Sequence, residues 1–128
     1  MEMSNFLKRI KSVVIKQPEY LEKTIESSWK VSEEISEALL KKGIGQILLT
    51  GCGDSFFAGI AGKYMFREFS NIMTCAEEAL ELAKYTKCSD KTVVIAFSAS
   101  GRTARTLEAV RKAKDNTAQV VAITNERD

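Results

Sequence analysis

Hydroxyl-bearing residues and a glycine cluster in one short segment, Ser98-Ala99-Ser100-Gly101-Arg102-Thr103, directly after an apolar run. The run, residues 93–97, is rich in β-branched and aromatic side chains, as is typical of a parallel strand buried on both faces. Thr103 is a suitable N-cap for the amphipathic segment that follows. A helix start presents N–H groups without intrahelical partners and the positive end of the helix dipole. With three hydroxyls and a glycine that permits close approach, the segment predicts a site for an anion such as a phosphate.

Two interpretations of this segment remain open from its residues alone, because Ser/Thr-rich strand–helix turns often only cap a helix. The segment has no P-loop lysine and no evident metal-binding carboxylate, which favours a sugar phosphate over a nucleoside triphosphate. We expect neither a metal nor a cofactor, since the chain has no histidine and its three cysteines lack C-x-x-C spacing. The absence of histidine also excludes Ser-His and Cys-His nucleophile pairs. Carboxylates, lysines or water must therefore supply any acid–base chemistry.

A second glycine-rich turn, Gly51-Cys52-Gly53-Asp54-Ser55, follows another predicted strand. A dinucleotide-binding fingerprint would need a third glycine at position 56, where this chain has Phe56. A Walker A loop is equally disfavoured, because Gly62-Lys63 has no suitably spaced glycine before it and lies mid-helix.

Strands alternate with helices from residue 46 onward. We predict strands at residues 46–50, 72–75, 92–97 and 119–124, with helices up to about residue 68, over 77–85 and over 103–114. This alternation predicts a three-layer αβα fold with a parallel, flavodoxin-like sheet of order 2-1-3-4. Ligands of such sheets bind at the carboxyl ends of the strands where the order reverses, so both turns should face one pocket. Four residues of the first of these helices recur at helical spacing and are expected in the core: Phe56, Phe57, Tyr64 and Met65.

Residues 1–45 are predicted to form a helical segment and residues 46–128 the α/β domain. Ser4 is a candidate cap for a first helix, and Pro18 occupies the first position of a longer second one. The apolar positions of the two helices are Phe6, Leu7, Ile10 and Val14, then Leu21, Ile25, Trp29, Ile35 and Leu39.

The composition is that of an ordinary soluble domain. The 128 residues carry a net charge of +2, too small to indicate nucleic-acid or membrane binding. No apolar run approaches the ~18 residues of a membrane span, and no secretory signal opens the chain. An odd number of cysteines (Cys52, Cys75 and Cys88) argues against a disulfide framework and favours the reducing cytoplasm.

The two turns above belong to an ordered set of motifs, whose other members are Ala58-Gly59, Ala79-Leu80-Glu81 with Tyr85, and Ala122-Ile123-Thr124-Asn125. This set resembles the sugar isomerase (SIS) domain family over essentially the whole chain. Gln17-Pro18-Glu19 further resembles the isomerase part of glucosamine-fructose-6-phosphate aminotransferases. The resemblance implies that Ser98, Ser100 and Thr103, with the backbone of Ala99 and Gly101, hold a phosphate. It also implies that the 52–55 turn touches the sugar and that Glu81 lies near the ligand as a candidate catalytic residue.

The function implied is binding of a hexose or aminohexose 6-phosphate within an aldose–ketose isomerase, an aminotransferase or a deaminase. The alternative is a non-catalytic regulatory domain that senses a sugar phosphate. Such regulators carry a DNA-binding helix-turn-helix, and residues 1–45 contain no basic recognition helix of that kind, which favours the enzyme.

Two departures from the family pattern affect these expectations. Ala99 stands where family members often have a polar side chain such as Gln, which leaves only the backbone N–H at that position. The sequence also ends after the fourth predicted strand, where the family has a fifth strand and, in the aminotransferases, a second SIS domain with the principal catalytic residues. We therefore expect a truncated domain without the full catalytic set, with an apolar edge at Val120–Ile123. Such an edge should self-associate into a homo-oligomer or pair with the missing second domain.

Overall fold

The computed structural model describes residues 2–125. It contains four helices and four strands in the order α1-β1-α2-β2-α3-β3-α4-β4. The chain divides into two compact units, Met1–Ala38 and Leu39–Asp128. The sequence-based division into a helical segment, residues 1–45, and an α/β domain, residues 46–128, stays a prediction.

Helix α1 (Glu2–Lys42) is one continuous helix with Pro18 inside it, so the expectation of two helices was wrong. A proline inside a helix lacks the N–H that would bond to the preceding turn and usually bends the helix. An i,i+4 ion pair between Glu19 and Lys23, at 2.6 Å, follows Pro18 directly and supports the next turn by a few tenths of a kcal/mol. The helix continues through the position of the lost hydrogen bond.

The sheet has four parallel strands in the described residues: β1 (Gln46–Gly51), β2 (Met73–Glu78), β3 (Thr92–Phe97) and β4 (Gln119–Ile123). Their order is β2-β1-β3-β4, which confirms the predicted 2-1-3-4 arrangement. Strand β2 is longer than the predicted 72–75 because it pairs with β1 along its whole length, from Gln46 opposite Met73 to Gly51 opposite Glu78. Glu77 and Glu78 therefore end β2, and the helix predicted from residue 77 begins at Ala79 with Glu78 as its N-cap.

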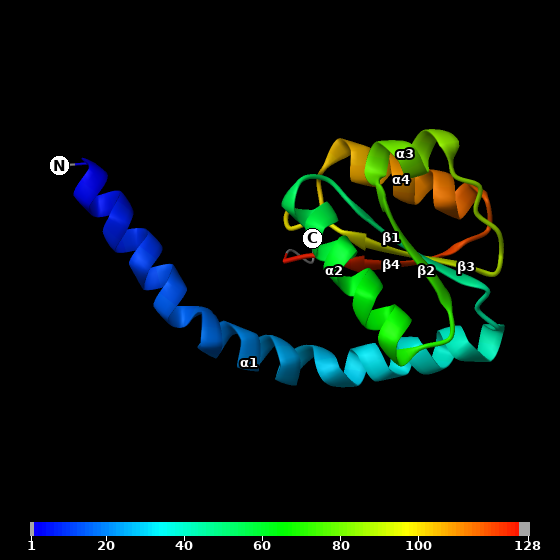
Figure 1. Ribbon diagram of the computed structural model, residues 1–128, viewed down its shortest axis with the longest axis horizontal. Coiled ribbons are helices and arrows are strands. Elements are labelled where there is room, and N and C mark those ends of the chain that lie inside the picture. Colours follow the sequence, from blue (N-terminus) through cyan, green and yellow to red (C-terminus); the bar gives the residue numbers. More distant parts are fainter. Residues whose placement is uncertain (1, 126–128) are drawn as a thin grey trace. The chain divides into compact units, whose positions relative to one another are not determined.

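Three further helices cover the two faces of the sheet: α2 (Asp54–Phe69), α3 (Ala79–Tyr85) and α4 (Ala104–Asp115). Figure 1 shows α3 and α4 together on one face and α2 on the other. Leu48 and Val94 pack with the small residues of α3 and α4, whereas Leu49 and Val93 pack on the α2 side with Phe66. The αβα layering predicted from the alternation of elements is confirmed.

Helix α2 packs on the sheet through small residues, which the sequence interpretation missed. An added Cβ at Gly59 or Gly62 would lie 3.4 or 3.2 Å from Leu49 atoms, so the helix approaches β1 closely along this face. Three of the bulky side chains expected in the core lie on its outer face instead. Phe57, Tyr64 and Met65 are 65%, 62% and 64% exposed, so the expectation was wrong for them. Phe56 is half-buried.

Strand β4 lies at one edge of the described sheet, as expected. Its last residue, Ile123, is 51% exposed, and Val121 packs only partly against the α2-side core. In the described part of the chain, no helix combines the length and apolar character that a bilayer crossing requires.

Candidate functional site

The loops that follow β1 and β3 leave the same edge of the sheet from neighbouring strands. Thr50 pairs with Ala96 near the ends of the two strands, and the helices that follow lie on opposite faces. A doubly wound sheet opens a crevice where the helices diverge in this way. Gly51 allows the ends of β1 and β3 and the start of α2 to approach closely. A Cβ at this position would lie only 2.9 Å from the Phe97 carbonyl oxygen and from Ser55.

The loop after β3 begins with a tight turn. The N–H of Ser98 donates to the Ile123 carbonyl of β4 at 3.0 Å, and the N–H of Gly101 donates to the Ser98 carbonyl at 3.0 Å. Gly101 has φ 65°, a left-handed conformation that glycine adopts without strain. Thr124 adds to the support, since its hydroxyl donates to the Ala99 carbonyl at 3.4 Å. The turn is thus anchored to the neighbouring strand end.

The hydroxyls of this loop lie around the start of α4. Ser98 is buried, and its hydroxyl donates to the Thr103 hydroxyl at 3.3 Å. Ser100 is exposed, and its hydroxyl accepts from the Arg102 N–H at 3.2 Å. Thr103 occupies the N-cap position as expected, but its side chain makes no capping hydrogen bond. Because Ser98 donates to it, the Thr103 hydroxyl proton can point toward an anion placed at the helix start.

Charge distinguishes the two helix starts at this edge. Helix α4 has no acidic residue in its first turn, whereas Asp54 occupies the first turn of α2. An anion is therefore favoured at the start of α4 and disfavoured beside Asp54.

The loop after β1 is short and contains a glycine with a positive φ angle. Gly53 is the N-cap residue of α2 with φ 55°, and its carbonyl accepts from the N–H of Phe56 at 3.0 Å. The N–H of Ser55 donates to the Cys52 carbonyl at 3.2 Å. Ser55 is half-buried, and Asp54 is exposed. This arrangement places the hydroxyl of Ser55 and the carboxylate of Asp54 at the start of α2, directly after the end of β1.

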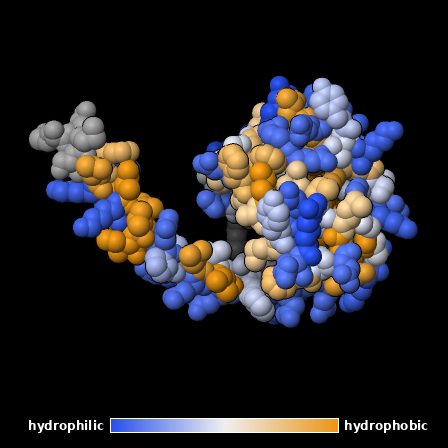
Figure 2. Space-filling model, viewed as in Figure 1, coloured by the Kyte–Doolittle hydropathy of each residue, from blue (hydrophilic) through white to orange (hydrophobic). Residues whose placement is uncertain are grey.

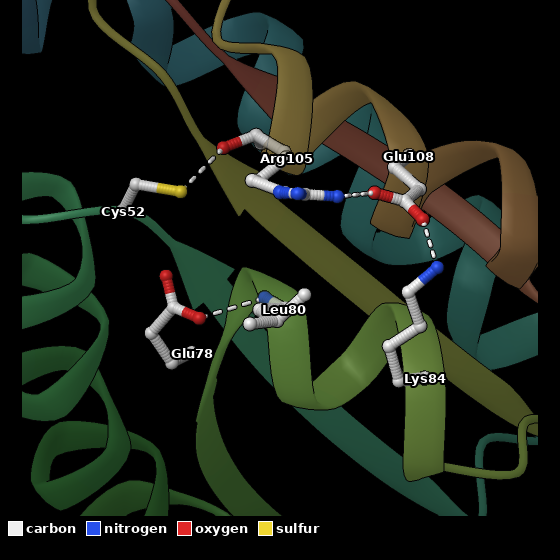
Figure 3. Close-up of polar contacts among 7 residues, drawn as sticks. Cys52, Glu78, Leu80, Lys84, Arg105 and Glu108 are labelled. Atoms are coloured by element: carbon white, nitrogen blue, oxygen red, sulfur yellow. Dashed lines mark hydrogen bonds and ion pairs between the residues drawn. The ribbon is translucent and has the colours of Figure 1, made fainter.

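A side-chain contact links the first loop to α4. The Cys52 sulfur lies 3.6 Å from the Thr106 hydroxyl oxygen, drawn as the dashed line from Cys52 in Figure 3. Thr106 is buried in the first turn region of α4. The loop after β1 is therefore in contact with the helix that follows the loop after β3.

The carboxylates near this edge come from β2 and α3. Glu78 accepts from the Leu80 N–H at 2.7 Å and so caps α3, and Figure 3 shows its side chain on the Cys52 side of that helix. Glu77 accepts a hydrogen bond from the Thr86 hydroxyl. Glu81 is exposed in the first turn of α3. Glu78 was not among the predicted site residues, although its position at the end of β2, opposite Gly51, could have indicated it.

The side chain of Arg105 forms an ion pair with Glu108 on the same helix. Its guanidinium donates to Glu108 at 2.6 Å, and Lys84 of α3 binds the other oxygen of the same carboxylate at 2.6 Å (Figure 3). Hydrogen bonds from Lys84 and Arg105 lower the pKa of Glu108 below its ordinary value.

Burial raises the pKa of the Cys88 thiol, and the charge of nearby Glu77 acts in the same direction. Among residues 2–125, no group of three or more His, Cys, Asp or Glu residues is arranged to hold a metal ion.

Comparison with known proteins identifies the fold family. The family model of the SIS domain matches residues 39–128. The chain belongs to the SIS domain family. The match begins at Leu39, where the second compact unit begins.

Relatives of this SIS domain share about a third of its residues. The glutamine–fructose-6-phosphate aminotransferase of Aeropyrum pernix is 37% identical over 113 residues, and that of Pyrococcus horikoshii is 33% identical over 114. Each alignment covers 88% of this chain but only 18% and 19% of the relative. The C-terminal domain of glucosamine-fructose-6-phosphate aminotransferase from Francisella tularensis superposes with a TM-score of 0.66 at 28% identity, covering 73% of this chain and 26% of that one. This SIS domain thus spans about a fifth of the length of the curated relatives it matches.

Proposed function

We propose that this SIS domain binds a hexose or aminohexose 6-phosphate, with the phosphate at Ser98, Ala99, Ser100, Gly101 and Thr103. The observation that carries the proposal is the meeting of two hydroxyl- and glycine-rich loops at the point where strand order reverses. The start of α4 supplies N–H groups, the dipole and a first turn without acidic residues. Ala99 contributes a backbone N–H only, because its side chain is a methyl group.

The sugar ring is proposed to contact the loop after β1. This loop consists of Cys52, Gly53, Asp54 and Ser55, and the exposed carboxylate of Asp54 can accept hydrogen bonds from sugar hydroxyls. The same carboxylate would repel the phosphate. The proposed ligand therefore has its phosphate at the loop after β3 and its sugar ring at the loop after β1.

The parent activity is proposed to be aldose–ketose isomerisation, or the related amino-sugar transfer or deamination. Isomerisation takes the proton from the carbon beside the carbonyl, forms an enediol, and returns a proton to the former carbonyl carbon. A carboxylate within hydrogen-bond reach of both carbons can serve as the base. Glu81 is the candidate predicted from the sequence, and Glu78 is a second carboxylate near the strand ends, already engaged in capping α3. The loops themselves contribute binding and orientation.

We also propose that the domain acts in the cytoplasm, as an oligomer or together with a second SIS domain. Its three cysteines are free thiols, which suits a reducing compartment.

Chemical-shift mapping with glucose 6-phosphate tests where the ligand binds. The proposal expects backbone amide shifts concentrated at residues 51–55 and 98–106, with the largest changes at the start of α4. Addition of unphosphorylated glucose at the same concentration is the control and should leave the 98–106 amides unchanged. Shifts concentrated outside these two loops would refute the site.

A further inference from the structure

Helix α1 exposes an apolar stripe that no described residue of its own unit covers. Every described side chain between residues 5 and 38 is exposed, including large apolar ones of the stripe such as Leu21 at 63% and Leu7 at 57%. Figure 2 shows apolar residues in an orange band along this helix with hydrophilic residues beside it. Contiguous apolar surface of this extent marks an interaction site.

The stripe follows a seven-residue repeat. Leu7, Val14, Leu21 and Ile35 fall on one position of the repeat, and Ile10, Val31 and Ala38 on the position three residues later. A repeat of this kind places both positions on one face, the arrangement used by two helices that pack side by side. The intervening positions Gln17, Thr24 and Ser28 are polar and lie near the middle of the stripe.

Charge along the same helix is separated into two halves. Residues 5–18 contain Lys8, Arg9, Lys11 and Lys16 and no acidic residue, a net charge of +4. Residues 19–38 contain six glutamates and two lysines, a net charge of −4. A second copy placed parallel would set like charges together, whereas an antiparallel copy sets each basic half against an acidic half.

We infer that α1 is a self-association surface that pairs antiparallel with α1 of a second copy of this chain. An alignment that sets Ile10 opposite Ile35 also sets Val14 opposite Val31, because both pairs are centred on the same point of the helix. It also sets polar Gln17 opposite polar Ser28, whereas Thr24 lies opposite Leu21. The contact is the same patch used twice, as a two-fold interface requires. The inference does not depend on the proposed ligand.

Sedimentation equilibrium of the full chain at high micromolar concentration tests the surface. The parent chain should be a dimer, and the double variant Ile10→Lys/Ile35→Lys should be a monomer with at least a hundredfold weaker association. The matched control, Ser12→Lys/Ser36→Lys, adds one lysine to each half outside the two stripe positions and should remain a dimer. A folded monomeric parent chain, or a lysine double variant that still associates, would overturn the inference. Persistent association would instead indicate the exposed face of α2 or the edge of β4.

Disulfide trapping tests the direction of pairing without altering the charges. Chains carrying Ile10→Cys and Ile35→Cys are mixed, oxidised and run on a non-reducing gel, with the parent chain as the control for its native cysteines. Antiparallel pairing predicts a cross-link only in the mixture, joining position 10 of one variant to position 35 of the other. Cross-linking of the Ile10→Cys chain with itself would contradict the antiparallel arrangement. Circular dichroism of each variant confirms that the helix and sheet are retained.

Discussion

Thr103 is the side chain whose removal should be most informative about the proposed phosphate-binding loop, residues 98–103. Its hydroxyl accepts from buried Ser98, which leaves its own proton available to a ligand oxygen. Replacing Thr103 with Val keeps the shape and removes the donor, and should weaken glucose 6-phosphate binding by about 1–3 kcal/mol, the scale of a hydrogen bond to a charged group. Isothermal titration calorimetry measures the change.

Two controls separate the hydroxyl from the rest of the side chain. Thr103→Ser retains the donor and should bind nearly as well as the parent chain. Ser36→Ala removes a hydroxyl on α1 that donates to the Ser32 carbonyl, and should leave affinity unchanged. Equal loss for the Val and Ser variants would show that packing, not the hydroxyl, explains the effect. Ser100→Ala should resemble Thr103→Val in magnitude.

Gly51 should be the least replaceable glycine of the described chain. A Cβ there would press on the Phe97 carbonyl and on Ser55, so the strand ends or α2 must move. We expect Gly51→Ala to lower the free energy of unfolding by about 1–3 kcal/mol, as overpacking does. Gly43→Ala is the matched control: it has φ 75° with no atom within 4 Å, so it adds only backbone strain of about 1 kcal/mol. Urea denaturation that ranks the two variants in the opposite order would contradict this account of the site.

At the scale of elements, the ion pairs of Glu108 connect α3 to α4. Because Lys84 and Arg105 lower the pKa of Glu108 in the folded chain, its contribution to stability is present above the ordinary pKa of 4.5 and is lost as the pH falls through the lowered value. The difference in Tm between the parent chain and Glu108→Gln should therefore be largest near neutral pH and disappear in acid. It should also shrink at high salt, since the groups are solvent-exposed. A difference that grows as the pH falls below 4.5 would contradict the assignment.

The alternation of elements was enough to predict the sheet order, and the buried run at residues 92–97 predicted β3 to the residue. The two loops could also be placed together, because parallel neighbours end at the same edge. Helix α2 shows where pattern reasoning failed: its sheet-facing residues include Gly59 and Gly62, and small residues carry little hydropathy signal. Glu78 was missed because β2 continues through two glutamates, and strand pairing with β1 overrides their low strand propensity. These outcomes depend on tertiary contacts that local sequence does not encode.

For the whole molecule, we expect binding without efficient isomerisation. Glu77 and Glu78 are engaged with Thr86 and the start of α3, which leaves exposed Glu81 as the available carboxylate of this group. Assays with fructose 6-phosphate and glucosamine 6-phosphate should show turnover well below ~1 s⁻¹, the low end for ordinary enzymes. Faster turnover that disappears in Glu81→Gln would show that this chain carries its own base.

The most direct test of the central claim is calorimetric titration of the parent chain with glucose 6-phosphate and with glucose. The phosphate loop at the start of α4 is proposed to supply most of the affinity, through helix N–H groups and the Ser98–Thr103 hydroxyls. The account predicts measurable binding of the 6-phosphate and much weaker binding of the unphosphorylated sugar. Competition by inorganic phosphate should raise the apparent Kd of the sugar phosphate. Equal affinity for glucose and glucose 6-phosphate would contradict the account.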